Sequence, residues 1–350
     1  MTAEAKTIAI IGAGHNGLTA AAYLAAQGFA VEVFEKRQSI GGLCVNETPF
    51  IKEGSKVKVS SVASYFGMMR KEIMADLELE SHGLKPYLTD PVEIVLLDYK
   101  DGNDQFSFTP RDGGEAKTEI ASLTAADQAG WQAFWGDIQR AAALIYPRYL
   151  APDLTQSEVI ELLKKDGLDK IADHIFSGSL VDLLKHYLQN EELMAVAATC
   201  TPGFANLVGS VFGCIHHGTA ETKGEFGAWG QVLGGMGAIT EALSKAAQAK
   251  GAKIHLGQAV ERLIVSSAGP DSKKPSVSAI ELADGSQRQF DLVVVNADSY
   301  VLFEQLIEAI DATAVVRQYL QDNRPKVSAA KLHFLLKELP SFKTLHKIGH

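Results

Sequence analysis

Cysteine is scarce in this sequence: only Cys44, Cys200 and Cys214 occur among its 350 residues. They form no C-x-x-C pair and no zinc-binding spacing, and an odd count does not fit the disulfide framework of a secreted domain. Clusters of Lys and Arg are also lacking, and the formal net charge is −9. Because contact with a phosphate backbone needs clustered cations, these absences exclude a nucleic-acid-binding protein.

A secretory leader is also missing from the first residues, which hold no basic region followed by an apolar one, so we expect a cytoplasmic protein. One segment, Met194 to Ile215, carries no charge and is long enough to span a bilayer. It also contains Pro202-Gly203, Asn206 and several Ser and Thr. We therefore predict buried helices or the wall of a substrate tunnel here, and peripheral membrane association stays open.

The segment 7–36 has the pattern of a dinucleotide-binding unit. The apolar run 7–11 predicts a parallel strand buried on both faces, and Gly12, Gly14 and Gly17 follow it as G-x-G-x-x-G. In this motif the first glycine permits a tight turn, and the second lets a pyrophosphate approach the backbone. The third allows close packing of helix and strand.

A helix is predicted over residues 18–27, after the glycines, and Gly28 is placed to end it. The start of the helix, at His15 and Asn16, directs free N–H groups and the positive end of the helix dipole toward the pyrophosphate.

A second strand is predicted over 30–34, and it leads to Glu35, whose carboxylate can accept hydrogen bonds from ribose hydroxyls. Lys36, next along the chain, belongs to the same predicted cofactor-binding set. Five residues separate Glu35 from Gly41 and Gly42, a spacing that resembles FAD-binding proteins related to glutathione reductase. The predicted cofactor is therefore FAD.

The stretch GGLCVNETP resembles the redox-disulfide segment of glutathione-reductase-type flavoenzymes. The second cysteine of such a pair would stand at Pro49, and no second G-x-G-x-x-G follows a strand elsewhere. We therefore predict that the protein is not a disulfide reductase. Cys44 is interpreted as a small apolar residue beside the cofactor, with a lone thiol next to the flavin as the alternative.

Three further segments, 60–91, 224–243 and 259–265, resemble the phytoene-desaturase-related flavoproteins. The branch most similar to them carries the family name pyridine nucleotide-disulfide oxidoreductase domain-containing protein 2. The resemblance covers nearly the whole chain. It implies an α/β fold, with a glutathione-reductase-like Rossmann-type FAD-binding domain and an inserted, mainly helical substrate domain.

The same resemblance implies a discontinuous FAD-binding domain, built from residues 1–70 and 225–300. The substrate domain would comprise 71–224 and 301–350. Strand 259–265 would lay its backbone near Val260 against the adenine, and Ala297, just after a predicted strand over 292–295, would lie on the flavin side. A hairpin is predicted between these two strands, around Asp284-Gly285.

The predicted insert contains a capping box at Thr124 and Asp127. Apolar residues then recur at helical spacing, and we predict that this stripe faces the core rather than the substrate; its members are Trp131, Phe134, Trp135, Ile138, Ala142 and Ile145. His216 and His217 are adjacent, so their side chains point apart, and no third ligand is suitably spaced. No metal site is predicted.

The family's C-terminal flavin motif, a Gly-rich segment with a His-Pro-Gly-Gly core, has no counterpart before His350. Residues 326–342 are predicted to form a substrate-domain strand and the turn after it. We expect either a fragment or half of a split enzyme, completed by a partner chain, or a truncated protein that binds FAD weakly and acts as a scaffold. Exposed apolar surface at such an end would favour homo-oligomers.

The resemblance implies an FAD-dependent oxidoreductase that takes a hydride from a small apolar substrate, isoprenoid-like or carotenoid-like. A flavin-dependent isomerase, an amine oxidase-like enzyme and a non-catalytic FAD-binding protein stay open as alternatives. No catalytic acid, base or nucleophile is assigned, since the redox chemistry belongs to the cofactor.

Overall fold

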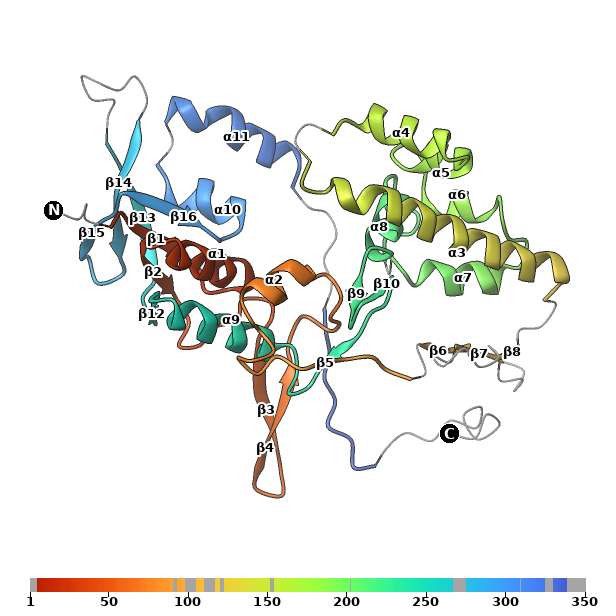
Figure 1. Ribbon diagram of the computed structural model, residues 1–350, viewed down its shortest axis with the longest axis horizontal. Helices are drawn as coiled ribbons and strands as arrows, with labels where there is room; N and C mark the ends of the chain where they lie inside the picture. Colours follow the sequence, from red (N-terminus) through yellow and green to blue (C-terminus); the bar gives the residue numbers. More distant parts are fainter. Residues whose placement is uncertain are drawn as a thin grey trace. The chain divides into compact units, whose positions relative to one another are not determined.

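The chain divides into two compact units in the computed structural model (Figure 1). Unit 1 comprises Met1–Tyr65, Arg70–Pro86 and Gln231–Leu335, and unit 2 comprises Phe66–Met69, Tyr87–Gly230 and Leu336–His350. The structure describes residues 5–90, 93–97, 105–109, 117–119, 123–151, 154–201, 203–266, 275–308, 310–324 and 330–338. The sequence analysis instead placed 71–86 and 301–335 in the substrate domain and 66–69 and 225–230 in the FAD-binding domain, and its division into functional domains stays a prediction.

Unit 1 is built on a parallel sheet with the strand order β12-β2-β1-β16. Its strands are β1 (Thr7–Ile11), β2 (Ala30–Glu35), β12 (Lys253–Leu256) and β16 (Leu292–Val295). In the register, Ile8 lies between Val31 of β2 and Leu292 of β16. The α/β fold with a parallel sheet is thus confirmed, and so are the strands predicted over 7–11 and 292–295.

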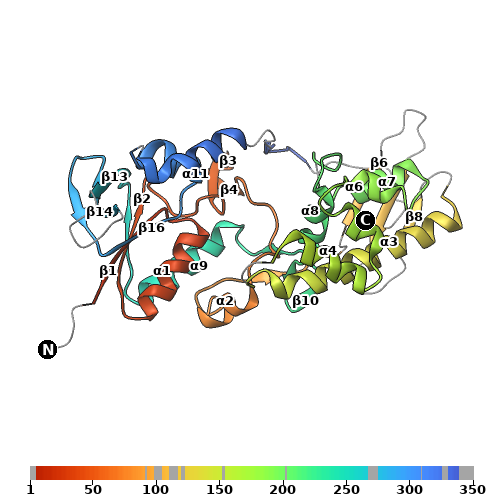
Figure 2. The same ribbon diagram turned by 90° about the horizontal axis from the view of Figure 1, so that it is seen from above.

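Helices and a second sheet cover the two faces of this parallel sheet. The helices α1 (His15–Ala26) and α9 (Gly237–Ala249) lie side by side, and α1 packs on β1 and β2 (Figure 2). The opposite face buries Ala9, Ile11 and Phe34 against the antiparallel strands β13–β15. These strands are β13 (Val260–Ser266), β14 (Ser276–Leu282) and β15 (Gln287–Gln289). Burial on both faces explains why β1 is a continuous apolar run.

Glycines end two helices of unit 1, and the first of them, Gly28, was predicted to do so. Gly28 follows α1 with a φ of +87°, and Gly251 follows α9 with a φ of +98°. A left-handed residue of this kind satisfies the last carbonyls of a helix at little cost when it is glycine. The helix α1 begins at His15, directly after its N-cap Gly14, which confirms the helix start predicted at His15 and Asn16.

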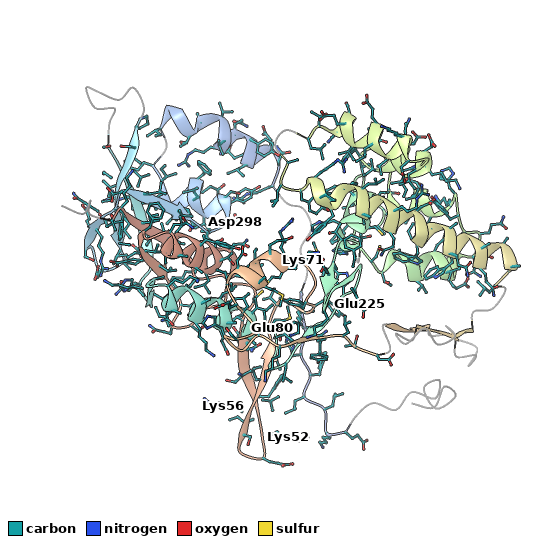
Figure 3. All side chains as sticks on the ribbon, in the orientation of Figure 1. Lys52, Lys56, Lys71, Glu80, Glu225 and Asp298 are labelled. Atoms are coloured by element: carbon teal, nitrogen blue, oxygen red, sulfur yellow. The ribbon has the colours of Figure 1, made fainter. Side chains whose placement is uncertain are left out.

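A hairpin in unit 1 was not predicted. It consists of β3 (Asn46–Lys52) and β4 (Ser55–Ser60), and Lys52 and Lys56 lie toward its tip (Figure 3). Asn46 at its base donates from Nδ2 to the carbonyl of Gly234 at 2.9 Å and accepts from the N–H of Gly237 at 3.1 Å. The Gly-rich segment before α9 is therefore a docking loop for this hairpin.

Further helices of unit 1 are α2 (Lys71–Asp76), α10 (Ser299–Val301), a π-helical turn (Leu302–Leu306) and α11 (Asp311–Asp322). The strand predicted within 326–342 is wrong for the described part of it, because residues 330–338 form no strand. Leu332 and Phe334 are about three-quarters exposed there, so apolar character does not report burial in this segment. The rest of 326–342 lies outside the described residues.

Unit 2 is mainly helical, as predicted for the insert. Its helices are α3 (Ala125–Ile145), a 3-10 turn (Tyr146–Arg148), α4 (Gln156–Lys165), α5 (Asp169–His174), α6 (Leu180–Leu184), α7 (Glu191–Ala198) and α8 (Ser210–His217). An antiparallel sheet of β6 (Glu93–Leu97), β7 (Gln105–Thr109) and β8 (Lys117–Glu119) was not predicted. Unit 2 also contains the short strands β9 (Glu221–Thr222) and β10 (Glu225–Phe226). Of the other short strands, β11 (Gln231–Val232) belongs to unit 1, and β5 (Pro86–Tyr87) lies where the chain passes from unit 1 to unit 2.

The capping box at the start of α3 is confirmed. Thr124 Oγ1 accepts from the N–H of Asp127 at 3.1 Å, and the carboxylate of Asp127 bonds back to the N–H of Thr124. The apolar stripe of α3 is also confirmed as a core face. Phe134, Ile138, Ala142 and Ile145 are buried in it, and Trp131 and Trp135 pack partly buried against the same cluster.

The uncharged segment 194–215 folds as parts of two short helices, α7 and α8, with a turn between them. Val196, Ala197, Val211, Cys214 and Ile215 are buried in the core of unit 2. Throughout the described ranges, no helix is both long and apolar enough to cross a membrane. The prediction of buried helices in this segment is therefore confirmed.

Candidate functional site

The carboxyl ends of the parallel strands in unit 1 gather the predicted cofactor-binding residues. Of the predicted set, Gly12 and Lys36 directly follow β1 and β2, and two residues outside it, Gly257 and Asn296, directly follow β12 and β16. Because all four strands are parallel, these residues meet at one edge of the sheet. In open α/β sheets, ligands bind in the crevice at this edge.

Two positions, one in the turn after β1 and one in the first turn of α1, have room only for glycine. Gly12 has a φ of +102°, and a Cβ there would stand 2.8 Å from the carbonyl oxygen of Asn296. A Cβ at Gly17 would stand 2.2 Å from the carbonyl oxygen of Gly12. The first helical turn of α1 therefore lies directly on the turn that precedes it, which requires a residue without a side chain.

The N-terminus of α1 is open. Gly14 is its N-cap and provides no side-chain hydrogen bond, and the first turn contains no acidic residue. The N–H groups of His15, Asn16 and Gly17 thus lack the intrahelical partners of later residues. Burial lowers the pKa of His15, so its side chain adds no positive charge at neutral pH. An anion at this point would be bound by backbone dipoles.

Gly41 and Gly42 lie against this helix start. The N–H of Gly41 donates to the carbonyl of Ala13 at 3.0 Å, and a Cβ at Gly42 would stand 3.1 Å from the Cα of Gly14. Both glycines have a positive φ, 139° and 57°. Gly14 and Gly42, which have no side chains, thus lie next to each other at the start of α1, so a ligand can approach the backbone of both closely.

Glu35 fixes the end of β2 to the glycine turn. Its Oε2 accepts from the N–H of Ala13 at 2.9 Å, and its Oε1 accepts from the N–H of Arg37 at 3.0 Å. The residue is buried, whereas Lys36 beside it is exposed. Each carboxylate oxygen has a second lone pair, so the group can still accept from a ligand hydroxyl.

The segment before β13 also reaches the end of β2. The N–H of Gln258 donates to the backbone carbonyl of Glu35 at 2.9 Å, which brings the start of β13 at Val260 close by. The side-chain Oε1 of Gln258 is buried and has no hydrogen-bond partner among the residues that the structure describes. A buried acceptor without a donor is costly, so this atom marks a place where a ligand group would bond.

Asn296 is a site residue that the sequence analysis missed. Its N–H donates to the carbonyl of Ile11 at 2.8 Å, and its side-chain amide nitrogen lies 2.9 Å from the position of a Cβ at Gly17. The sequence did contain a signal for this role, because Asn296 directly follows the apolar run Leu292–Val295 and therefore lies at the edge of the sheet where ligands bind. Ala297 comes next, partly buried, and Asp298 then caps α10 through the N–H of Tyr300 at 2.8 Å (Figure 3).

Cys44 is buried within unit 1 near the start of α1. Burial raises the pKa of its thiol, and its Sγ lies 3.8 Å from Nδ1 of His15. The hydroxyl of Thr240 on α9 donates to the carbonyl of Cys44 at 2.9 Å. A protonated, buried thiol is a poor nucleophile, which agrees with the interpretation of Cys44 as a small packing residue.

His216 and His217 lie in the interior of unit 2 at the end of α8. His216 Nδ1 is 3.0 Å from the hydroxyl of Tyr149, and burial lowers the pKa of His216. The ring of His217 packs edge-on against Trp229, with 5.5 Å between centroids. Aromatic neighbours account for the positions of both rings.

An α/β unit with a parallel sheet, whose glycine turn and helix start meet at the carboxyl edge, defines the class of nucleotide-binding α/β proteins. Within that class, residues 17–345 match the model of the flavin containing amine oxidoreductases. The chain belongs to this family, and membership implies FAD as the cofactor.

Among curated relatives, the chain is similar to pyridine nucleotide-disulfide oxidoreductase domain-containing protein 2 of Mus musculus, with 30% identity over 95% of this chain and 60% of the relative. It is 23% identical to a 4,4'-diapophytoene desaturase (4,4'-diapolycopene-forming) of Methylomonas sp, over 92% of this chain and 58% of the desaturase. The chain thus spans about three-fifths of the length of these relatives.

A solved structure supports the fold. An oxidoreductase from Methanosarcina mazei superposes with a TM-score of 0.56 at 21% identity, over 90% of this chain and 64% of the other. The family model and the curated relatives confirm the predicted kinship with phytoene-desaturase-related flavoproteins, and the superposition supports the α/β fold.

Proposed function

We propose that this chain is an FAD-dependent oxidoreductase in which unit 1 holds the cofactor, the mainly helical unit 2 is the substrate domain, and the substrate is a small apolar molecule. The fold of unit 1 is proposed to be of the glutathione-reductase-like Rossmann type. Counted along the chain, its parallel strands have the order 3-2-1-4, which matches the first four strands of the order 3-2-1-4-5-6 of dinucleotide-binding sheets. When bound, FAD supplies the acceptor for a hydride from a C–H bond of the substrate.

The open N-terminus of α1, walled by backbone without side chains, carries the proposal. The N–H groups of His15, Asn16 and Gly17 would hold the pyrophosphate, with Gly14 and Gly42 leaving the space that it needs. The geometry favours a dinucleotide because the anion site and the carboxylate of Glu35 meet at one edge.

The remaining roles follow from position along the same edge. Glu35 would accept from the ribose hydroxyls, with exposed Lys36 beside it. Val260 would lie near the adenine, and the buried, unpartnered Oε1 of Gln258 offers a bond to a ribose hydroxyl or the adenine amino group. Ala297, which follows Asn296, would lie on the flavin side.

The substrate is proposed to be an apolar, isoprenoid-like molecule. The relationship to the Methylomonas desaturase supports it. An amine is the second candidate, because the family model that matches residues 17–345 is that of flavin containing amine oxidoreductases.

The test is a visible absorbance spectrum of the purified chain, before and after incubation with FAD and gel filtration. We expect oxidised-flavin bands in the parent chain. In Gly14→Ala, flavin affinity should fall by about tenfold or more, since a methyl group would occupy the pyrophosphate space. Gly136→Ala is the matched control, because Gly136 lies exposed in α3 with nothing within 4 Å of its Cβ position. Full flavin occupancy in Gly14→Ala would contradict the proposed site.

Anaerobic addition of candidate substrates then separates the alternatives. Bleaching of the flavin band by an isoprenoid hydrocarbon, but not by an amine, supports the first candidate. Turnover without net bleaching indicates an isomerase, and stable flavin binding without any reaction indicates a non-catalytic FAD-binding protein.

A further inference from the structure

Two thiols of unit 2 lie in direct contact. Cys200 comes just after α7, and Cys214 lies in α8, 14 residues further along the chain. The Sγ atoms of Cys200 and Cys214 lie 2.9 Å apart, within hydrogen-bond distance. Both cysteines are free, and forming an S–S bond between them would need little movement of either side chain.

The two thiols differ in access. Cys214 is 1% exposed and belongs to the core of unit 2, whereas Cys200 is partly exposed at its margin. The third cysteine, Cys44, belongs to unit 1, where His15 is its neighbour. The pair is therefore set apart from the proposed cofactor site by its place in the chain.

We propose that Cys200 and Cys214 are a reversible redox site that forms an intramolecular disulfide by exchange with a small disulfide such as oxidised glutathione. The thiolate of Cys200 attacks one sulfur of the small disulfide, which releases one small thiol and leaves a mixed disulfide on Cys200. The thiolate of Cys214 then attacks the Sγ of Cys200 and releases the second small thiol. In total, two protein thiols lose two electrons and two protons, and the small disulfide gains them.

The order of the steps follows from the environment of each sulfur. Contact with Cys200 and burial together hold the pKa of Cys214 well above its usual range, so Cys214 does not attack first. Once Cys200 carries the mixed disulfide, it no longer bears a negative charge beside Cys214. Deprotonation of Cys214 is then no longer opposed by a negative charge on Cys200. The Sγ of Cys214 also already lies in contact with the Sγ of Cys200 that it attacks.

The disulfide would join the end of α7 to the middle of α8 and close the turn between them. This turn exposes three apolar side chains, Phe204, Leu207 and Val208, at 38%, 48% and 70%. A crosslink at the base of a short loop removes open conformations of that loop. Oxidation should therefore protect the turn from a protease that recognises Phe and Leu.

The whole chain is equilibrated in glutathione buffers that range from fully reduced to fully oxidised. Its free thiols are then alkylated, and its mass is measured by mass spectrometry. We expect two of the three thiols to disappear together, with the loss of two hydrogen atoms in mass, while Cys44 is alkylated after unfolding. Peptide mapping should recover a crosslinked peptide that contains Cys200 and Cys214. Chymotryptic cleavage at Phe204 or Leu207 should slow by roughly tenfold after oxidation and recover with a reductant.

Single variants separate the steps. Cys214→Ser should accumulate glutathione on Cys200, whereas Cys200→Ser should leave the buried Cys214 reduced and unmodified. Cys44→Ser is the control and should form the disulfide like the parent. The proposal is overturned if all three thiols stay reduced in the oxidised buffer, if the crosslink involves Cys44, or if Cys200→Ser becomes glutathionylated at Cys214.

Discussion

The carboxylate of Glu35 accepts a hydrogen bond from the N–H of Ala13 at 2.9 Å, so the end of β2 is tied to the turn that follows β1. The other oxygen of the same carboxylate accepts from the N–H of Arg37 at 3.0 Å. One buried side chain thus orders two backbone segments at the edge where the cofactor is proposed to bind.

Replacement of Glu35 by Gln should lower stability and flavin affinity together. An amide offers one acceptor oxygen instead of two, so one of the two backbone N–H groups would face an NH₂ group. We expect the free energy of unfolding of unit 1 to fall by about 1–3 kcal/mol, measured by urea denaturation with circular dichroism. Glu47→Gln, at an exposed position of β3, is the control. Equal stability of Glu35→Gln and the control would contradict the structural role.

The two glycines at the start of α1 should respond differently to alanine. A Cβ at Gly17 would stand 2.2 Å from a backbone oxygen, whereas the nearest atom to a Cβ at Gly14 is a side-chain nitrogen at 3.3 Å. We expect Gly17→Ala to cost about 3 kcal/mol or more, because the backbone of the turn must shift. Gly14→Ala should keep the parent's melting curve without FAD. A melting curve of Gly17→Ala like that of Gly14→Ala would argue against this turn.

The free energy of unfolding of unit 2 should fall at acidic pH because of Asp127. A hydrogen bond from Thr124 and two from the N–H groups of Gln189 and Asn190 lower the pKa of Asp127 to about 2, from an ordinary value of 3.8. Since the folded pKa is the lower one, this stabilisation is fully present above pH 3.8 and is lost as the pH falls toward 2.

Asp127→Asn should therefore be less stable than the parent at neutral pH, by about 2 kcal/mol, and the difference should shrink between pH 4 and pH 2. Trp131 and Trp135 lie in the same helix and report its unfolding by fluorescence. A constant difference between the two proteins across this pH range would show that the carboxylate charge is not responsible.

Cys44→Ala should retain bound flavin and its reduction by substrate. The thiol is buried with a raised pKa, and no second cysteine lies near it in the sequence, so its loss should cost only about 1 kcal/mol of packing. Flavin content and stopped-flow reduction rates compare the variant with the parent. A variant that binds flavin fully but is no longer reduced by substrate would instead assign the thiol a chemical role.

The sequence was sufficient for the centre of unit 1. The run 7–11, the glycines after it and the run 292–295 each predicted their elements, because a strand buried on both faces leaves a continuous apolar pattern. The hairpin β3–β4 was missed for the opposite reason. Most residues of β3 are exposed and show no alternation, and the short alternation of Lys and Val over 56–59 in β4 was not used as a strand signal.

The candidate site shows the same limit. The glycines and Glu35 could be found, since their roles depend on local spacing along the chain. Asn296 could also have been found, since it directly follows the apolar run Leu292–Val295. Gln258 could not be ranked as a site residue, because it reaches the site only through its hydrogen bond to Glu35, far away in the sequence. The contact of Cys200 with Cys214 was hidden likewise, since it depends on how α7 and α8 pack.

The parallel sheet has a consequence for synthesis of the chain on the ribosome. Thr7 bonds to Asp291, 284 residues later, so β1 emerges long before β16, its partner on one side. Until then, one edge of β1 lacks its partner, and the glycine turn lacks the neighbouring Asn296. Nascent chains arrested before residue 296 should therefore bind chaperones through β1 and fail to bind flavin. After release from arrest, the chain should dissociate from the chaperones and bind flavin.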